Sequence, residues 1–277
     1  DSIISNNNRR IQRFSGYEQL NLLQKVRYRL NDNMDLTYSF TYAGTGGAPR
    51  YDRLIQYRNN KLRFAEWSYG PMLWRMHSLT LTDTKKRMLS DGARLVIGYQ
   101  NYAESRIDRT RSTTTRNIQS ESVDAYSLNW DAQKKIGKGS FFYGFEYVFN
   151  QIGSVGSRTN ITNGVVSPFV SRYPNKSRWQ TNGIYGSYKM NLHEKVTLLT
   201  GLRYSYNQLN ANFDTTFIKF PYQKTNIKDG GLTGNLGIVY RPSDKLQLNG
   251  NFSTGYRMPN VDDVGKLFES IPGNLTV

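Results

Sequence analysis

The sequence predicts an all-β protein, a transmembrane antiparallel β-barrel, and three observations support this. Hydrophobic residues make up only 37% of the 277-residue chain, yet aromatic residues reach 13%, with 20 Tyr among them. Apolar and polar residues alternate with a period of two in many segments, which indicates strands with two different faces. Tight turns alternate with long polar connections along the chain, as they do in bacterial outer-membrane barrels.

The composition excludes the other common classes of protein. A mean hydropathy of −0.65 leaves too little aliphatic material to fill the core of a soluble enzyme of this length. The sequence has no run of about 18 apolar residues, so a helical membrane span is excluded. A closed barrel is the other structure that satisfies every backbone group inside a bilayer. The chain has no cysteine, which excludes disulfides and thiolate metal sites.

Ten segments carry the alternating pattern. In 34–44, Leu36, Tyr38 and Phe40 alternate with polar residues, and 141–149 places five aromatic residues on one face. The segments are long enough to cross a bilayer as tilted strands, which takes about 9–11 residues. We expect strands at 17–31, 34–44, 71–83, 91–106, 120–135, 140–152, 179–191, 195–209, 231–242 and 245–258.

The connections between these strands are of two kinds. Tight turns are predicted at Asn31-Asp32-Asn33, Gly137-Lys138-Gly139, His193-Glu194 and Ser243-Asp244. Long polar loops are predicted at 45–70, 107–119, 153–178, 210–230 and 259–277. In outer-membrane barrels the tight turns face the periplasm and the long loops face the outside.

The formal net charge of +16 is concentrated in the predicted loops. Segments 45–63, 106–116 and 153–178 carry net charges of +4, +3 and +4. Arginine in outward loops is suited to the phosphates of lipopolysaccharide, which we expect as a partner. A specific site for an anionic ligand is the alternative. No nucleic acid partner is predicted, because the charge is divided between separate loops.

Two stretches carry a more specific signal. The first is Pro49-Arg50-Tyr51-Asp52-Arg53-Leu54 with Leu62-Arg63-Phe64-Ala65-Glu66-Trp67-Ser68-Tyr69-Gly70-Pro71. The second is Gly255-Tyr256-Arg257-Met258-Pro259-Asn260-Val261-Asp262-Asp263, continuing with Gly265-Lys266-Leu267-Phe268-Glu269 and Pro272-Gly273-Asn274-Leu275. Both resemble the barrel portion of TonB-dependent outer-membrane receptors, particularly those of Bacteroidetes-type bacteria. The stretch Tyr256-Arg257-Met258-Pro259 is similar to that family's Phe-Arg-Ala-Pro motif at the top of a late barrel strand.

The resemblance implies a barrel of 22 strands, an N-terminal plug domain with a TonB box, and import driven by the TonB energy-transducing complex. Ten strands alone would leave two unpaired edges in the membrane. We therefore expect 1–277 to be a partial β-barrel domain, with the plug and the C-terminal strands outside this chain. The expected cargo is an iron chelate, either a siderophore or heme. Glycan uptake is disfavoured, because the Phe-Arg-Ala-Asp-Gly motif of that branch is absent. Heme receptors of this family typically carry a histidine in the loop after the Arg-Pro motif, and its absence from 260–277 counts against heme without excluding it.

The candidate site residues come mainly from the two stretches. Trp67, Tyr69 and Trp74 are interpreted first as an interfacial girdle, with stacking against cargo as the alternative. Arg257 is expected as a buried guanidinium that braces the loop or the plug with its five donors. The predicted ligand-binding residues are Arg50, Tyr51, Trp67, Tyr69 and Arg257, and the predicted structural residues of the second motif are Tyr256, Arg257, Pro259 and Asn260.

No catalytic residue, metal site or cofactor is predicted. The two histidines, His77 in a strand and His193 in a tight turn, are not expected to meet, and a Gly-x-Ser-x-Gly elbow is absent. A lumenal His77 in contact with heme or metal is the less favoured interpretation of that residue. The lead hypothesis is an importer of iron-bearing cargo, not an enzyme. The alternatives are a passive porin or structural surface barrel, and an omptin-like barrel protease, which needs a histidine and carboxylates at the extracellular rim.

Overall fold

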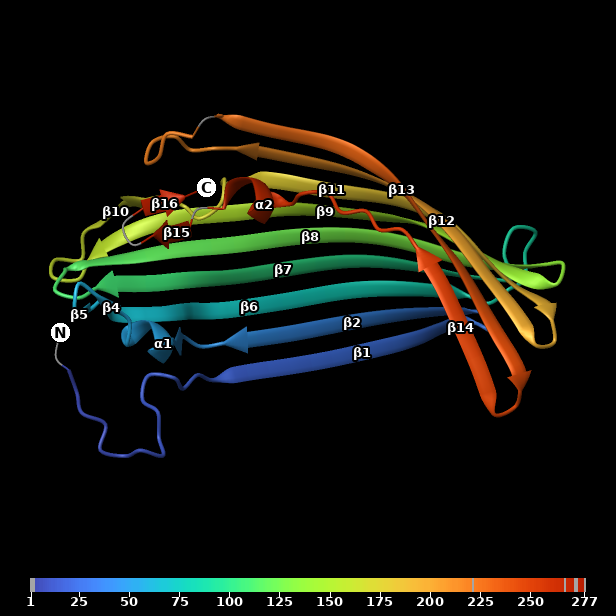
Figure 1. Cartoon of the computed structure of the whole chain (residues 1–277), viewed down its shortest axis with the longest axis horizontal. Coiled ribbons are helices and arrows are strands. Elements are labelled where there is room, and N and C mark those ends of the chain that lie inside the picture. The colour runs from blue at the N-terminus through green and yellow to red at the C-terminus, as the bar shows by residue number, and fades with distance from the viewer. Residues whose placement is uncertain (1–2, 221, 267, 272–273, 277) are drawn as a thin grey trace.

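The computed structural model describes residues 3–220, 222–266, 268–271 and 274–276, with side chains as far as Lys266. Its main sheet is an antiparallel meander that curves as a tall wall (Figure 1). The strands, in spatial order, are β1 (Gln19–Asn31), β2 (Met34–Thr45), β6 (Phe64–Asp83), β7 (Gly92–Thr110), β8 (Thr115–Ile136), β9 (Gly139–Asn160), β11 (Ser177–His193), β12 (Val196–Asn212), β13 (Lys224–Ser243) and β14 (Leu246–Ser253).

Several short strands and helices lie near the end of this wall that carries the long connections, which we call the loop end. β3 (Ala48–Pro49) pairs with β6, and β10 (Val166–Phe169) pairs with β9. Two small hairpins join β4 (Tyr57–Arg58) to β5 (Lys61–Leu62) and β15 (Phe268–Ile271) to β16 (Asn274–Thr276). The helices of the described residues are α1 (Tyr51–Leu54) and α2 (Val261–Gly265). Neither of these helices is long and apolar enough to cross a membrane.

The all-β fold class and the ten predicted strands are confirmed, but several boundaries are wrong. The expected loop 107–119 is a turn of four residues, because β7 continues to Thr110 and β8 begins at Thr115. β6, β9 and β13 also extend into the expected loops, whereas the last strand ends at Ser253 instead of 258. Beyond the membrane both faces of a strand carry polar residues. The apolar–polar alternation is lost there, so the sequence does not show that the strand continues.

The strand register gives the wall one apolar face and one polar face. Residues that pair directly across antiparallel strands point to the same side. Phe40, His77, Tyr99, Tyr126 and Phe149 pair in succession from β2 to β9 and form one continuous row. Their ring centroids lie 4.9 to 6.4 Å apart along the row. The row has the position and composition of an interfacial aromatic girdle.

This aromatic row lies on the apolar face, which points outward to the lipid. It marks the level at which the wall leaves the membrane on the side of the long loops. Below it, the outward side chains of β8 are Leu128 and Trp130, and above it they are Asp124 and Ser122. In β9 the outward aromatics span 141–149, which is roughly 27–30 Å along the strand and, at the usual tilt, fits an apolar band of about 25 Å. β9 then continues for a further distance of about 35 Å.

The segment after β14 folds back over the polar, lumenal face. Figure 1 shows this chain in red, passing from β14 to α2 across the wall. Leu209, Met258 and Val261 are buried there and form an apolar cluster on which Tyr173 and Trp179 pack. The segment therefore covers the lumenal face near the loop end of the wall, which we call the upper lumenal wall. The aromatic girdle lies on the opposite, outward face.

Candidate functional site

A cluster of arginines and aromatic rings lies on the upper lumenal wall beside α1. The guanidinium carbon of Arg50 lies 5.5 Å from the ring centroid of Trp67 and 5.4 Å from that of Tyr69. Its Nη1 donates a hydrogen bond of 3.1 Å to the Tyr69 hydroxyl. Arg53 lies over Trp67 at 5.4 Å, and Arg106 lies over Tyr69 at 5.6 Å. We refer to Arg50, Arg53, Trp67, Tyr69 and Arg106 as the arginine–aromatic cluster.

The register shows which way the aromatic residues of β6 point. Tyr69 pairs with Arg106, and Trp74 pairs with Tyr102, on the lumenal face of β7. The interpretation of Trp67, Tyr69 and Trp74 as an interfacial girdle is therefore wrong. A bulge after Gly70, at Pro71, shifts the alternation by one residue. It brings Trp67 and Tyr69 to the lumen, where contact with cargo stays a prediction.

An acidic residue of α1 holds the Arg50 side chain in place. Asp52 accepts two hydrogen bonds of 2.7 Å from the Arg50 guanidinium. These bonds hold the pKa of the Asp52 carboxyl below its ordinary value, so this carboxylate stays charged. The bidentate pair fixes the plane of the guanidinium over the two rings. Tyr51 lies beside it with 37% of its surface exposed.

A pocket of about 280 Å³ adjoins the cluster and is partly closed by the segment after β14. Arg106 pairs with Glu104 at 3.1 Å, and Glu104 lines the pocket, so the pocket and the cluster share one wall. Opposite, the Tyr173 hydroxyl donates to Asp262 at 2.7 Å. Burial, together with this bond, raises the pKa of Tyr173. We refer to this space as the lumenal pocket; its walls include Tyr102, Glu104, Glu121, Tyr173, Trp179 and Asp262.

The second motif forms a latch that fixes this segment. The Tyr256 hydroxyl donates to Asp229 of β13 at 3.0 Å. Asn260 caps α2 by accepting from the backbone N–H groups of Asp262 and Asp263, and its own N–H donates to Asp263. Pro259, just before the cap, is exposed. The Asn260 N–H lowers the pKa of Asp263 most, followed by the Arg257 guanidinium.

Arg257 does not adopt the expected environment. Its side chain is 74% exposed and pairs with Asp263 at 2.6 Å. The expected burial is therefore wrong, while the contact with Asp263 braces the start of α2. The described contacts do not join Arg257 to the arginine–aromatic cluster, so the five predicted ligand-binding residues do not form a single site.

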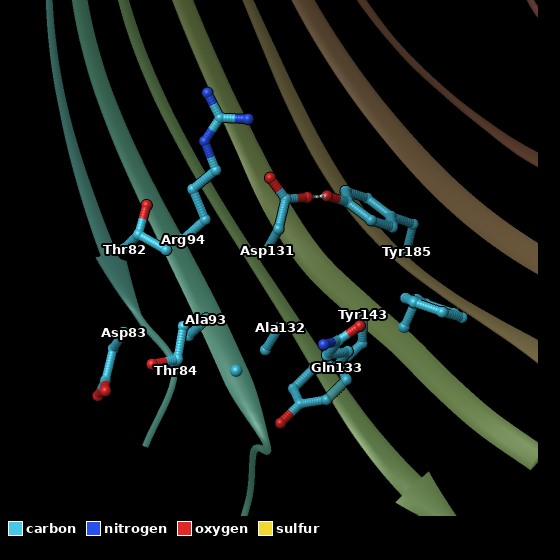
Figure 2. Close-up of a pocket in the computed structure, with 12 residues that line it drawn as sticks. Thr82, Asp83, Thr84, Ala93, Arg94, Asp131, Ala132, Gln133, Tyr143 and Tyr185 are labelled. Carbon is cyan, nitrogen blue, oxygen red and sulfur yellow. Dashed lines mark hydrogen bonds between the residues drawn. The ribbon is translucent and has the colours of Figure 1, made fainter. Parts of the chain in front are cut away.

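A second polar network occupies the lumenal face at the turn end of the wall. Here a cavity of about 310 Å³ is lined by Arg94, Asp131 and Tyr185. The Tyr185 hydroxyl donates a hydrogen bond to Asp131 across β9 (Figure 2). The intervening residue is Gly144, where a Cβ atom would lie 2.6 Å from the Tyr185 oxygen. The sequence analysis missed this network, although a glycine inside a strand signals such a close approach.

An ion pair beside this cavity depends on glycine in the same way. Arg203 of β12 reaches across β11 and donates to Glu146 of β9 at 2.9 Å. It also donates to Ser205 and lies 5.7 Å from the ring centroid of Tyr185. The side chain passes over Gly183, where a Cβ atom would collide with the guanidinium.

The histidines lie away from both pockets. His77 is in the outward aromatic row, and its Nδ1 is 2.8 Å from the Tyr38 hydroxyl. His193 ends β11 at the tight-turn rim. The interpretation of His77 as a lumenal heme or metal contact is therefore wrong. Among the described residues, His, Asp and Glu side chains do not gather in groups of three that could hold a metal ion.

Comparison with known proteins agrees with this architecture. A family model described as "TonB dependent receptor-like, beta-barrel" matches residues 5–275. The chain therefore belongs to the family of TonB-dependent receptor barrels, which are outer-membrane proteins. The comparison with curated proteins found no match.

Several solved structures share the fold at low sequence identity. The copper transporter OprC is 11% identical with a TM-score of 0.74, covering 88% of this chain and 38% of its own. The hemophore receptor HasR of Serratia marcescens, solved with its hemophore HasA and heme, is 13% identical with a TM-score of 0.60, covering 91% and 38%. The ferric yersiniabactin uptake receptor FyuA of Yersinia pestis is 13% identical with a TM-score of 0.60, covering 86% and 37%. The chain thus spans well under half of these relatives.

Proposed function

We propose that the chain forms part of the barrel wall of an outer-membrane importer energised by TonB. The proposed cargo is an iron chelate, either a siderophore or heme. The arginine–aromatic cluster is the observation that carries this proposal. Guanidinium groups over aromatic rings offer both charge and stacking surface to an anionic chelate with flat ligand groups. The cluster faces the lumen above the girdle, where cargo would arrive from outside.

The remaining partners are part of the same proposal. A plug domain preceding residue 1 would connect the barrel to the TonB complex, and further strands after 277 would close it. Lipopolysaccharide would contact exposed cations such as Arg58 and Lys61 of the β4–β5 hairpin. Arg106 would not take part, because it lies on the lumenal face and pairs with Glu104.

The two alternatives are less well supported. An omptin-like protease requires a histidine at the extracellular rim of the lumen, whereas His77 faces outward and His193 lies at the opposite rim. We therefore propose a transporter and not an enzyme. A passive porin needs an unobstructed lumen, but the segment after β14 packs across the upper wall.

The test is growth of a deletion strain on ferric siderophores and on heme as sole iron sources. The full-length gene should restore growth on at least one of them, and Arg50→Ala or Trp67→Leu should reduce uptake about tenfold or more. Arg116→Ala is the matched control, because Arg116 lies outward and pairs with Glu66 at 2.8 Å. Equal growth of the deletion strain and the parent strain on every iron source would refute iron import.

A further inference from the structure

Glu121 is a buried acidic residue without a hydrogen-bond partner among the described residues. It lies on the lumenal face of β8, paired in register with Glu104 and Ser154, and only 6% of its surface is exposed. Both carboxylate oxygens are buried and have no hydrogen-bond partner among the described residues. A carboxylate in this position is destabilising unless a donor or a cation faces it.

Two cations beside the pocket form ion pairs with other acids, although the charge of Arg106 also acts on Glu121 and its Nη1 is buried without a hydrogen-bond partner among the described residues. Arg106 pairs with Glu104 at 3.1 Å and lies over the Tyr69 ring. Lys266 pairs with Asp262 at 2.9 Å. Both of these acids line the lumenal pocket together with Glu121. Of the three carboxyl groups, Glu121 is therefore the one that accepts no hydrogen bond from the described residues.

The rest of the lumenal pocket suits a compact organic cation. Its walls include the rings of Tyr102, Tyr173 and Trp179, and aromatic faces attract ammonium groups. The indole N–H of Trp179 is also buried without a hydrogen-bond partner among the described residues. The volume of about 280 Å³ accommodates one side arm of a ligand.

We propose that the lumenal pocket binds a primary ammonium group, with Glu121 accepting its hydrogen bonds and the three rings enclosing its carbon stem. The ligand class is an iron chelate that carries an amine arm. In this respect the inference rests on the proposed function. The chelate itself would contact the arginine–aromatic cluster, which shares the Arg106–Glu104 pair with the pocket.

The experiment measures binding of a small amine to the purified full-length receptor in detergent by isothermal titration calorimetry. The probe is 2-phenylethylamine, which is protonated at neutral pH, and the uncharged comparison is 2-phenylethanol. The wild-type receptor should bind the amine at least tenfold more tightly. Glu121→Gln, which keeps the shape of the side chain, should remove that preference. Glu194→Gln makes the same charge change in the exposed turn at the opposite rim and should keep it.

The wild-type comparison decides the inference even if Glu121→Gln does not reach the membrane. Equal affinity for the amine and the alcohol, or no binding of the amine, would overturn it. A preference that survives in Glu121→Gln would also overturn it. Iron-dependent growth is a separate readout: intact growth without amine preference rejects only the ammonium subsite, whereas absence of growth on every iron source rejects the importer.

Discussion

Substitution of Gly183 by alanine should cost stability only through Arg203. The three heavy atoms nearest to a Cβ atom at Gly183 all belong to the Arg203 guanidinium, so the backbone itself has room. Displacing Arg203 breaks its bond to Glu146 and its contact with Tyr185. The ion pair is about one third exposed on each side, so solvent screening limits its value to about 1 kcal/mol, and the cation–π contact adds about 0.5–1 kcal/mol.

The measurement is a double-mutant cycle on the full-length receptor in lipid vesicles, by guanidinium titration of the free energy of unfolding. Gly183→Ala alone should destabilise by about 1–2 kcal/mol, as should Arg203→Ala. In the Arg203→Ala background, Gly183→Ala should be neutral or stabilise by up to about 1 kcal/mol, because alanine loses less backbone entropy. Additive losses in the double variant would refute the reasoning.

Three further predictions concern the latch and the girdle. Met258→Ala removes a buried side chain at a cost of about 2–5 kcal/mol and loosens the packing around Trp179. The emission of Trp179, followed in a variant with no other tryptophan, should therefore shift to the red. An unchanged spectrum would contradict the packing. The pKa of Asp263 is lowered by the Asn260 N–H and by Arg257, so its contribution is present at neutral pH and lost as the pH falls. The same emission should therefore hold from pH 7 to 5 and shift below about pH 4. An acid shift at the same pH in Asp263→Asn would mean that another group controls the latch. His77→Phe should leave growth on heme unchanged, since His77 faces outward between rings; reduced growth would place it in the cargo path.

The fold could be predicted because one face of each membrane-crossing segment is apolar. The alternation in 34–44 and 141–149 follows directly from lipid on one side and water on the other. Prediction failed where both sides are wet. The sequence Arg106-Ile107-Asp108-Arg109 continues β7, but its charges made it resemble a loop.

The site was harder to predict because it depends on contacts that are distant in sequence. Trp67 and Tyr69 reach the lumen through a single bulge near Pro71, and one residue of register reverses their direction. Glu121 lines a pocket completed by Val261 and Asp262, which are far along the chain. Local patterns identify aromatic and charged residues, but they do not show which of these share a wall.

The extension of the strands above the aromatic row separates two kinds of selection. Below Tyr126 each outward residue must remain apolar for the wall to insert in the membrane. Above it, β8 presents polar residues such as Asp124 and Ser122 on the outside, and β8 and β9 line the lumen on the inside. Lumenal residues above the row, such as Trp67 and Glu121, can therefore change while the apolar band in the membrane stays constant. The lumenal surface at the loop end can thus vary without any change in the part of the wall that enters the membrane.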